Sequence, residues 1–265
     1  MTFGLLGHQI AYSLSPIIHN MIAREHIDYR LFDISPDKLD KAVFGILSRL
    51  SGFNVTIPYK QRIMQYCQEF DPVAKKIGAV NTIHIKKAAW IGYNTDYLGF
   101  MRVIKKNIPD YLSYHPVILG YGGVARAVIF GLETLGFHAV SVYGGKQQQE
   151  RETFIEAISP LLRMQVLDIL PDIPRLWINC TPVGSVKIPD IPEEFIKFRP
   201  DDMLYDLNYA PYPTYLEQAA NKQDILTING IQMLIYQAIE SQSIWMEKDA
   251  ATDVDIDTII HSINQ

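Results

Sequence analysis

Apolar and polar residues alternate clearly from Phe53 to Ile57, where Asn54 and Thr56 occupy the polar positions. An alternation of period two is typical of a half-buried β-strand, because successive side chains of a strand point to opposite faces. Asn54 and Thr56 are therefore predicted to lie on the same face of this strand.

Pro58 follows this strand, and its fixed φ angle suits the first turn of a helix, which the pattern predicts over 59–66. Lys60 is then expected in that first turn, where the positive end of the helix dipole disfavours a protonated ammonium group. Most lysines are simply solvated surface residues. A functional role for Lys60 therefore requires a partner from another part of the chain.

Strand and helix patterns alternate through the first hundred residues. The predicted strands cover 2–6, 29–34, 53–57, 77–85 and 89–93, and an amphipathic helix is predicted over 36–50. Because strands that alternate with helices usually belong to βαβ units, the pattern predicts an α/β fold with a mainly parallel sheet and crossover helices.

Three short polar motifs stand beside these elements. In Ser13-Leu14-Ser15-Pro16, Ser15 is predicted to cap a helix that begins at Pro16, which leaves the hydroxyl of Ser13 available for a ligand such as a carboxylate. Asp96 precedes an apolar helix pattern and can serve simply as a favourable carboxylate at a helix start. Asn81 can equally be a turn residue.

A second α/β pattern begins near His115. A strand is predicted over 116–119, a glycine-rich turn over 120–126, a helix over 127–135 and another strand over 139–143. This context supports a dinucleotide site, because the glycines let the backbone approach a pyrophosphate that the helix N-terminus then holds. The motif is a variant, with Ala125 in place of the third glycine.

The end of the second strand in this pattern bears on the cofactor. A site for NAD usually has an acidic residue about 20 positions after the glycine motif. The chain instead has Tyr143-Gly144-Gly145-Lys146, without a carboxylate. The missing acid argues against an ordinary NAD site, and the single lysine is the local candidate for a 2′-phosphate contact.

The last third of the chain continues the alternation. Strands are predicted over 165–167, 176–180, 203–207 and 225–227, a long helix after Gly230, and an amphipathic helix near 254–263. Turns at strand ends are where open α/β sheets bind ligands. Gly230 and Gln237 are seven residues apart and share one face of the long helix. A glutamine there is usually solvated, and a buried one must find hydrogen-bond partners.

Composition narrows the class of protein. The chain has 265 residues, of which 48% are hydrophobic and 20% charged, so one large or two modest domains are expected. The net charge of -5 and the lack of a basic run argue against nucleic acid. The absence of a signal segment or long apolar run predicts a cytoplasmic protein without membrane partners. The two cysteines and seven histidines show no metal-ligand spacing, so no metal is expected.

These motifs together resemble the shikimate dehydrogenase family, which includes shikimate and quinate dehydrogenases. The resemblance covers nearly the whole chain, and its motifs occur in the family's order: Ser13-Leu14-Ser15-Pro16, Asn54-Val55-Thr56-Ile57-Pro58-Tyr59-Lys60, Gly78-Ala79-Val80-Asn81-Thr82, Asn94-Thr95-Asp96, the glycine turn, Asn179-Cys180-Thr181-Pro182 and Gly230-Ile231-Gln232-Met233-Leu234. One such motif carries little information, but the ordered set is specific.

The resemblance implies two domains with a cleft between them. Residues 1–98 and 238–265 would form the substrate-binding and catalytic domain, and 99–237 a Rossmann-like dinucleotide domain. Lys60 and Asp96 would be the catalytic pair. Substrate contacts are implied for Ser13, Ser15, Thr56, Asn81, Tyr209 and Gln237. Cofactor contacts are implied for Gly120, Gly122, Gly123, Val124, Thr181, Leu207, Gly230 and Met233.

The implied enzyme reduces 3-dehydroshikimate to shikimate with hydride from NADP(H), a step in chorismate and aromatic amino acid biosynthesis. Its partner is a small cyclic hydroxy acid, and a monomer or homodimer is expected. The family usually has Asn-Arg-Thr after the second strand of the nucleotide domain, and its arginine clamps the 2′-phosphate. That motif is missing here, so Lys146 or Arg151 is the expected substitute, NADP binding is expected to be less selective, and NAD stays an alternative.

Three other functions compete with this one. A quinate or dual quinate/shikimate dehydrogenase would share the fold and the catalytic pair. A ligand-binding paralogue without hydride transfer would fit the missing arginine, but the intact Lys60 and Asp96 argue against it. A dehydrogenase of the methylenetetrahydrofolate type is disfavoured by the paired serines and by Asn94-Thr95-Asp96.

Overall fold

The chain forms two compact units, each built on its own β-sheet. The computed structural model describes residues 1–265 except 24–26, 144–147, 168, 249–253 and 264–265. Unit 1 comprises residues 1–99 and 234–265, and unit 2 comprises 100–233. The boundaries between the two units fall inside two helices, α4 (Asp96–Asn107) and α8 (Ile231–Met246).

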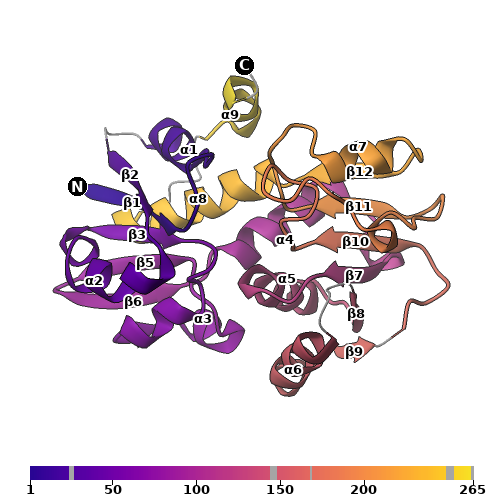
Figure 1. Cartoon of the computed structure of the whole chain (residues 1–265), viewed down its shortest axis with the longest axis horizontal. Coiled ribbons are helices and arrows are strands. Elements are labelled where there is room, and N and C mark those ends of the chain that lie inside the picture. The colour runs from indigo at the N-terminus through magenta and orange to yellow at the C-terminus, as the bar shows by residue number, and fades with distance from the viewer. Residues whose placement is uncertain (24–26, 144–147, 168, 249–253, 264–265) are drawn as a thin grey trace. The chain divides into compact units, whose positions relative to one another are not determined.

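Unit 1 contains a six-stranded mixed sheet with the order β2-β1-β3-β5-β6-β4 (Figure 1). Its strands are β1 (Thr2–Gly7), β2 (Asp28–Asp33), β3 (Gly52–Val55), β4 (Glu69–Phe70), β5 (Thr82–Lys86) and β6 (Ala89–Tyr93). β5 runs antiparallel to both of its neighbours, while the pairs β1–β2, β1–β3 and β4–β6 are parallel. The prediction of an α/β fold is confirmed. In this sheet, three strand pairs are parallel and two are antiparallel.

The helices of unit 1 bury apolar residues from distant parts of the chain. They are α1 (Ser15–Ile22), α2 (Leu39–Phe44), α3 (Pro72–Ile77), the start of α4, most of α8, and α9 (Ile256–Ile263). Ile18 of α1 packs with Ile235 of α8 and Ile259 of α9, and all three are almost fully buried. The two ends of the chain therefore complete one hydrophobic core.

Some predicted boundaries in unit 1 were wrong. The helix predicted over 36–50 is broken into the 3-10 turn Pro36–Lys38, α2, and the 3-10 turn Leu47–Arg49. Gly45 ends α2 with φ -106° and ψ -99°, outside the helical region. Ile46, an apolar residue of this predicted helix, is 48% exposed.

Unit 2 is a Rossmann-like unit whose six described strands are all parallel. Its order is β12-β11-β10-β7-β8-β9 (Figure 1). The strands are β7 (His115–Leu119), β8 (Ala139–Tyr143), β9 (Gln165–Leu167), β10 (Arg175–Asn179), β11 (Met203–Asp206) and β12 (Leu226–Asn229). The order reverses between β7 and β10, and ligands of open α/β sheets bind at such a switch point.

Three helices of unit 2 follow these strands: α5 (Gly123–Thr134), α6 (Gln148–Ile158) and α7 (Tyr215–Asn221). The 3-10 turns Tyr111–Ser113, Ser159–Leu161 and Glu193–Phe195 connect other elements. The strands predicted over 139–143 and 165–167 are confirmed at both ends. Helix α5 begins four residues earlier than predicted, inside the glycine turn, because Gly122 is its N-cap.

Candidate active site and dinucleotide site

A buried ion pair joins two segments of unit 1 that are far apart in sequence. Lys60 Nζ lies 2.8 Å from Asp96 Oδ2, and the two side chains are only 12% and 7% exposed. The Lys60 backbone carbonyl accepts a hydrogen bond from Val80 N at 2.7 Å, which holds the lysine turn beside the entry to β5. Lys60 thus has the partner that its sequence context alone did not supply.

The expected helix around Lys60 was wrong. Lys60 lies in a turn, and the 3-10 helix that follows begins only at Arg62. A helix dipole therefore does not explain the environment of this lysine. Asp96 does begin a helix, as predicted, and its backbone N–H donates to Asn94 Oδ1 at 3.1 Å.

Asn81 supports the second oxygen of Asp96. Its Nδ2 group donates to Asp96 Oδ1 at 2.8 Å and also lies 2.9 Å from Thr95 Oγ1 and 3.3 Å from Gln237 Oε1. Asn81 Oδ1 accepts from Thr95 N at 2.7 Å, which fixes the orientation of the amide. The carboxylate of Asp96 is thereby held between an ammonium group and an amide.

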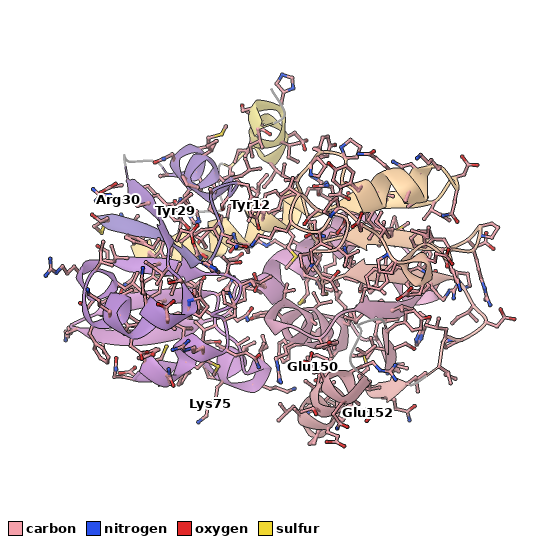
Figure 2. The ribbon with its side chains drawn as sticks, in the orientation of Figure 1. Tyr12, Tyr29, Arg30, Lys75, Glu150 and Glu152 are labelled. Carbon is pink, nitrogen blue, oxygen red and sulfur yellow. The ribbon has the colours of Figure 1, made fainter. Side chains whose placement is uncertain are left out.

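A polar network continues from Asn81 into the interior. Asn54 Nδ2 donates to Thr82 Oγ1 at 3.0 Å and to Ser241 Oγ at 2.9 Å. Asn54 Oδ1 accepts from the hydroxyl of Tyr29, labelled in Figure 2, at 2.8 Å. Sequence reasoning missed Ser241, although it follows Gln237 by four residues on α8 and therefore shares its face. Buried polar groups paired in this way rigidify a site.

The two serines lie at the start of α1, but Ser15 does not cap the helix as predicted. Helix α1 begins at Ser15, and its N-cap is Leu14. Ser15 N donates to Ser13 Oγ at 3.3 Å, and Ser13 Oγ donates to Ser15 Oγ at 3.1 Å. Ser13 therefore accepts a local backbone bond, and within the described residues neither hydroxyl is bonded to the Lys60–Asp96 pair.

Two other predicted substrate contacts follow strands of different units. Thr56 follows β3, and its backbone N–H donates to Leu6 O at 2.8 Å. Tyr209 belongs to unit 2, after β11. Among the predicted substrate residues, Asn81 donates a hydrogen bond to Asp96, and Gln237 lies 3.3 Å from the Asn81 amide.

The glycine turn of unit 2 has the geometry that a pyrophosphate requires. Gly120 has φ +96°, and a Cβ there would lie 2.5 Å from Thr181 Cγ2, so glycine is needed for both reasons. A Cβ on Gly122 would meet no atom within 4 Å, which shows open space above the turn. Gly123 and Val124 then begin α5, whose first N–H groups have no partners within the helix. The turn fits a dinucleotide phosphate.

Asp206 organises the strand ends beside this turn. Its Oδ1 accepts from Asn179 Nδ2 and from Asn208 N and Nδ2, and its Oδ2 accepts from Thr214 Oγ1. Asn179 Oδ1 in turn accepts from Thr181 N and Oγ1. Burial raises the pKa of Asp206 to about 7. The turn after β10 is thus fixed through a carboxylate whose hydrogen-bond partners, among the residues that the structure describes, are all uncharged.

The remaining predicted cofactor residues also belong to unit 2. A Cβ on Gly230 would lie 2.2 Å from Leu207 O, so only glycine allows α8 to start this close to the end of β11. Met233 is buried. Lys146 lies outside the described residues. In the described part of the chain, no group of His, Cys, Asp or Glu could hold a metal ion, and no helix is long and apolar enough to cross a membrane.

Known proteins share both the sequence and the fold. Residues 5–83 match the shikimate dehydrogenase substrate binding domain. The shikimate dehydrogenase (NADP(+)) of Nostoc sp. strain PCC 7120 is 36% identical to this chain, over 97% of this chain and 93% of that protein. This chain belongs to the shikimate dehydrogenase family.

Solved structures of shikimate dehydrogenases support the same conclusion. A shikimate dehydrogenase in complex with NADP+ is 34% identical, with a TM-score of 0.83 over 100% of this chain and 96% of that one. A shikimate 5-dehydrogenase from Listeria monocytogenes, in complex with shikimate and NAD, is 26% identical, with a TM-score of 0.81 over 99% and 96%. The order of strands in both sheets is therefore that of a two-sheet shikimate dehydrogenase.

Proposed function

We propose that this chain catalyses the reversible reduction of 3-dehydroshikimate to shikimate with NADPH. The observation that carries the proposal is the buried pair of Lys60 and Asp96, whose Nζ and Oδ2 atoms are 2.8 Å apart. The family membership and the names of the NADP(+)-dependent relatives support the choice of substrate and cofactor.

Reduction of a ketone requires hydride at carbon and a proton at oxygen, and NADPH, when bound, supplies the hydride. Lys60 donates a hydrogen bond to the carbonyl oxygen and stabilises the negative charge that develops on it. Asp96 holds the ammonium group in place, and Asn81 holds Asp96 through its other oxygen. This division of roles makes Lys60 the proton donor and Asp96 its orienting carboxylate.

The other substrate contacts follow from their chemistry. Ser13 and Ser15 offer hydroxyls near the start of α1 for the substrate carboxylate. Thr56, Asn81, Tyr209 and Gln237 offer hydroxyl and amide groups for the ring hydroxyls of the substrate. Gln237 accepts a hydrogen bond from Asn81, which also donates to Asp96. Gln237 is therefore linked to the proposed catalytic pair through Asn81.

The cofactor would be held by unit 2. Gly120, Gly122, Gly123 and Val124 would hold the pyrophosphate, and Thr181, Leu207, Gly230 and Met233 would lie along the nicotinamide half. Unit 1 would then be the substrate-binding domain and unit 2 the dinucleotide domain. In the cell the reaction would belong to chorismate and aromatic amino acid biosynthesis in the cytoplasm, and the protein would act as a monomer or homodimer.

The test is an absorbance assay at 340 nm with shikimate or quinate against NADP+ or NAD+. The expected result is that kcat/KM is highest for shikimate with NADP+. Higher kcat/KM for quinate would indicate a quinate dehydrogenase, because one additional hydroxyl changes the hydrogen bonding that the pocket must satisfy. No turnover with any pair, despite tight binding of shikimate, would indicate a non-catalytic paralogue.

A further inference from the structure

An arginine of the glycine turn has neither a carboxylate nor a hydrogen-bond partner for its inner nitrogen. Arg126 lies in the first turn of α5, and its Nε atom is buried. In the described part of the chain, this Nε has no hydrogen-bond partner and no acidic side chain pairs with the guanidinium. Burial lowers the pKa of Arg126 without an opposing acid. A partly desolvated cation of this kind is stabilised by an anion.

The guanidinium lies over an aromatic ring of α6, the helix that follows β8. Arg126 Cζ lies 5.3 Å from the centre of the Phe154 ring on α6, the helix that follows β8. The same ring lies 6.4 Å from the ring of Tyr121 in the glycine turn. β8 ends beside this turn, since Gly120 N donates to Tyr143 O at 3.2 Å. In a Rossmann unit, the ribose 2′ position of the cofactor lies at the end of this second strand.

Two charged side chains of α6, Arg151 and Glu150, already have hydrogen-bond partners. Arg151 Nη1 donates to the backbone carbonyl of Val142 at 3.2 Å. Glu150, labelled on α6 in Figure 2, accepts from the hydroxyl of Tyr121 at 2.9 Å. Both side chains come from the first half of α6, whereas Arg126 comes from α5 and lies over α6 without such a bond.

We propose that Arg126 binds the 2′-phosphate of NADP(H) and so replaces the arginine that the chain lacks after β8. The inference rests on the proposed function, because it presumes that unit 2 binds NADP(H). An arginine presents a planar fork that matches two oxygens of a phosphate, and its stack on Phe154 holds that fork in one orientation. NADPH selectivity is then retained without the Asn-Arg-Thr motif.

The test compares nucleotides that differ only in the 2′-phosphate. Isothermal titration calorimetry measures Kd for NADPH and NADH with the wild type and with Arg126→Met, which keeps the packing on Phe154 but removes the charge. We expect Kd for NADPH to rise about 10- to 100-fold, the usual cost of a lost charged hydrogen bond, and Kd for NADH to change less than about twofold. The unchanged NADH affinity also shows that the variant is folded.

Two further variants sharpen the result. Arg151→Met is the matched control from the same region, and its Kd for NADPH is expected to stay within about threefold of the wild-type value. Glu150→Gln removes a negative charge that is hydrogen-bonded to Tyr121 of the glycine turn, and it is expected to tighten NADPH binding modestly while leaving NADH binding unchanged.

Three outcomes would overturn the inference. An equal loss of NADPH and NADH affinity in Arg126→Met would place the arginine on the pyrophosphate, and an unchanged Kd for NADPH would leave it a packing residue. A larger loss in Arg151→Met than in Arg126→Met would transfer the role to Arg151. Failure of the proposed function looks different, because it would appear with the wild type in the 340 nm assay, as a lack of turnover of shikimate with NADP+ or as a preference for quinate.

Discussion

Each unit holds a buried aspartate at the end of a strand or the start of a helix, and the two are stabilised differently. Asp96 of unit 1 has an ammonium group on one oxygen and an amide on the other. Asp206 of unit 2 is fully buried and accepts only from amides, a backbone N–H and a hydroxyl. The pair with Lys60 suits a carboxylate that must stay charged during proton transfer, whereas Asp206 suits a structural junction.

Removing the cation from Asp96 would make it resemble Asp206, and this is the largest expected effect. Lys60→Ala deletes the proposed proton donor, so kcat should fall about 10²- to 10⁴-fold, the usual contribution of general acid catalysis. NADPH affinity should not change. Steady-state kinetics and calorimetry measure the two quantities, with Lys75→Ala, an exposed lysine of α3 (Figure 2), as the control. Retention of most of the wild-type kcat would refute the assignment.

The uncompensated charge of Asp206 predicts a pH dependence of stability. Its pKa is about 7 in the folded protein, against 3.8 for an aspartate side chain exposed to water, so the folded state binds the proton more tightly. The contribution of this group to the free energy of unfolding is therefore fully present below pH 3.8 and is lost as the pH rises through about 7. Between pH 5 and 7 the loss is on the order of 2–3 kcal/mol.

Asp206→Asn tests this directly, since an amide oxygen can keep the three bonds made by Oδ1 and the Thr214 hydroxyl can turn to accept. Urea unfolding at pH 5, 6, 7 and 8 should show a flatter decline in the variant than in the wild type. Glu217, whose pKa burial also raises, contributes with the same sign. The exposed Asp201→Asn is the control. Parallel curves for wild type and Asp206→Asn would contradict the prediction.

Unit 1 contains a buried histidine, His19, whose effect on the pH dependence of stability is opposite to that of Asp206. Burial lowers the pKa of His19 from 6.5 to about 3, and its ring stacks on Tyr29 at 4.2 Å. Between pH 6.5 and 3 the histidine is protonated in the unfolded state but neutral in the folded state. Its contribution to the free energy of unfolding is therefore present above pH 6.5 and is lost as the pH falls toward 3. Between pH 6.5 and 5 it amounts to roughly 2 kcal/mol.

His19→Phe keeps the stacked ring and removes the titration. Urea unfolding at pH 7 and 5 should show a smaller loss of stability on acidification in this variant than in the wild type. His138→Gln, at an exposed histidine of unit 2, should behave as the wild type does. An undiminished loss in His19→Phe would assign the acid sensitivity to other groups.

The smallest expected effect concerns the neutral donor on Asp96. Asn81→Ala leaves the ion pair but removes the amide that holds the second oxygen, so kcat should fall about tenfold, the value of one hydrogen bond to a charged group. Thermal unfolding checks that the variant is folded. A loss as large as that of Lys60→Ala would mean that Asn81 touches the reacting atoms itself, whereas an unchanged kcat would remove it from the positioning role.

Sequence patterns predicted the strands better than the contacts between them. The alternation in 89–93 and 139–143 is local, and both strands occur as predicted. Helix ends depend on single residues, and Gly45 ends α2 in the middle of the helix predicted over 36–50. The pairing of Lys60 with Asp96 followed from the family resemblance, since neither residue's own surroundings distinguish it from a surface lysine or a helix-start carboxylate.

The least predictable parts of the site are tertiary. Asn54 meets Ser241 across 187 positions of sequence, and no local pattern encodes such a distance. Arg126 lies at the end of the glycine turn, whose sequence predicts phosphate contacts for its glycines and gives no indication of a role for the arginine side chain. Its importance becomes visible from what surrounds the guanidinium in the folded unit, because a missing counter-charge leaves no trace in sequence.

The late position of α8 bears on how the protein is made. Trp245 Nε1 donates to Ile83 O at 2.9 Å, and its ring fills the space beside Gly52 and Phe3. When only the first hundred residues have left the ribosome, the hydrophobic core of unit 1 therefore still lacks the residues that α8 contributes. Unit 2 is continuous and can fold before synthesis ends, so unit 1 is completed last although its first residues are translated first.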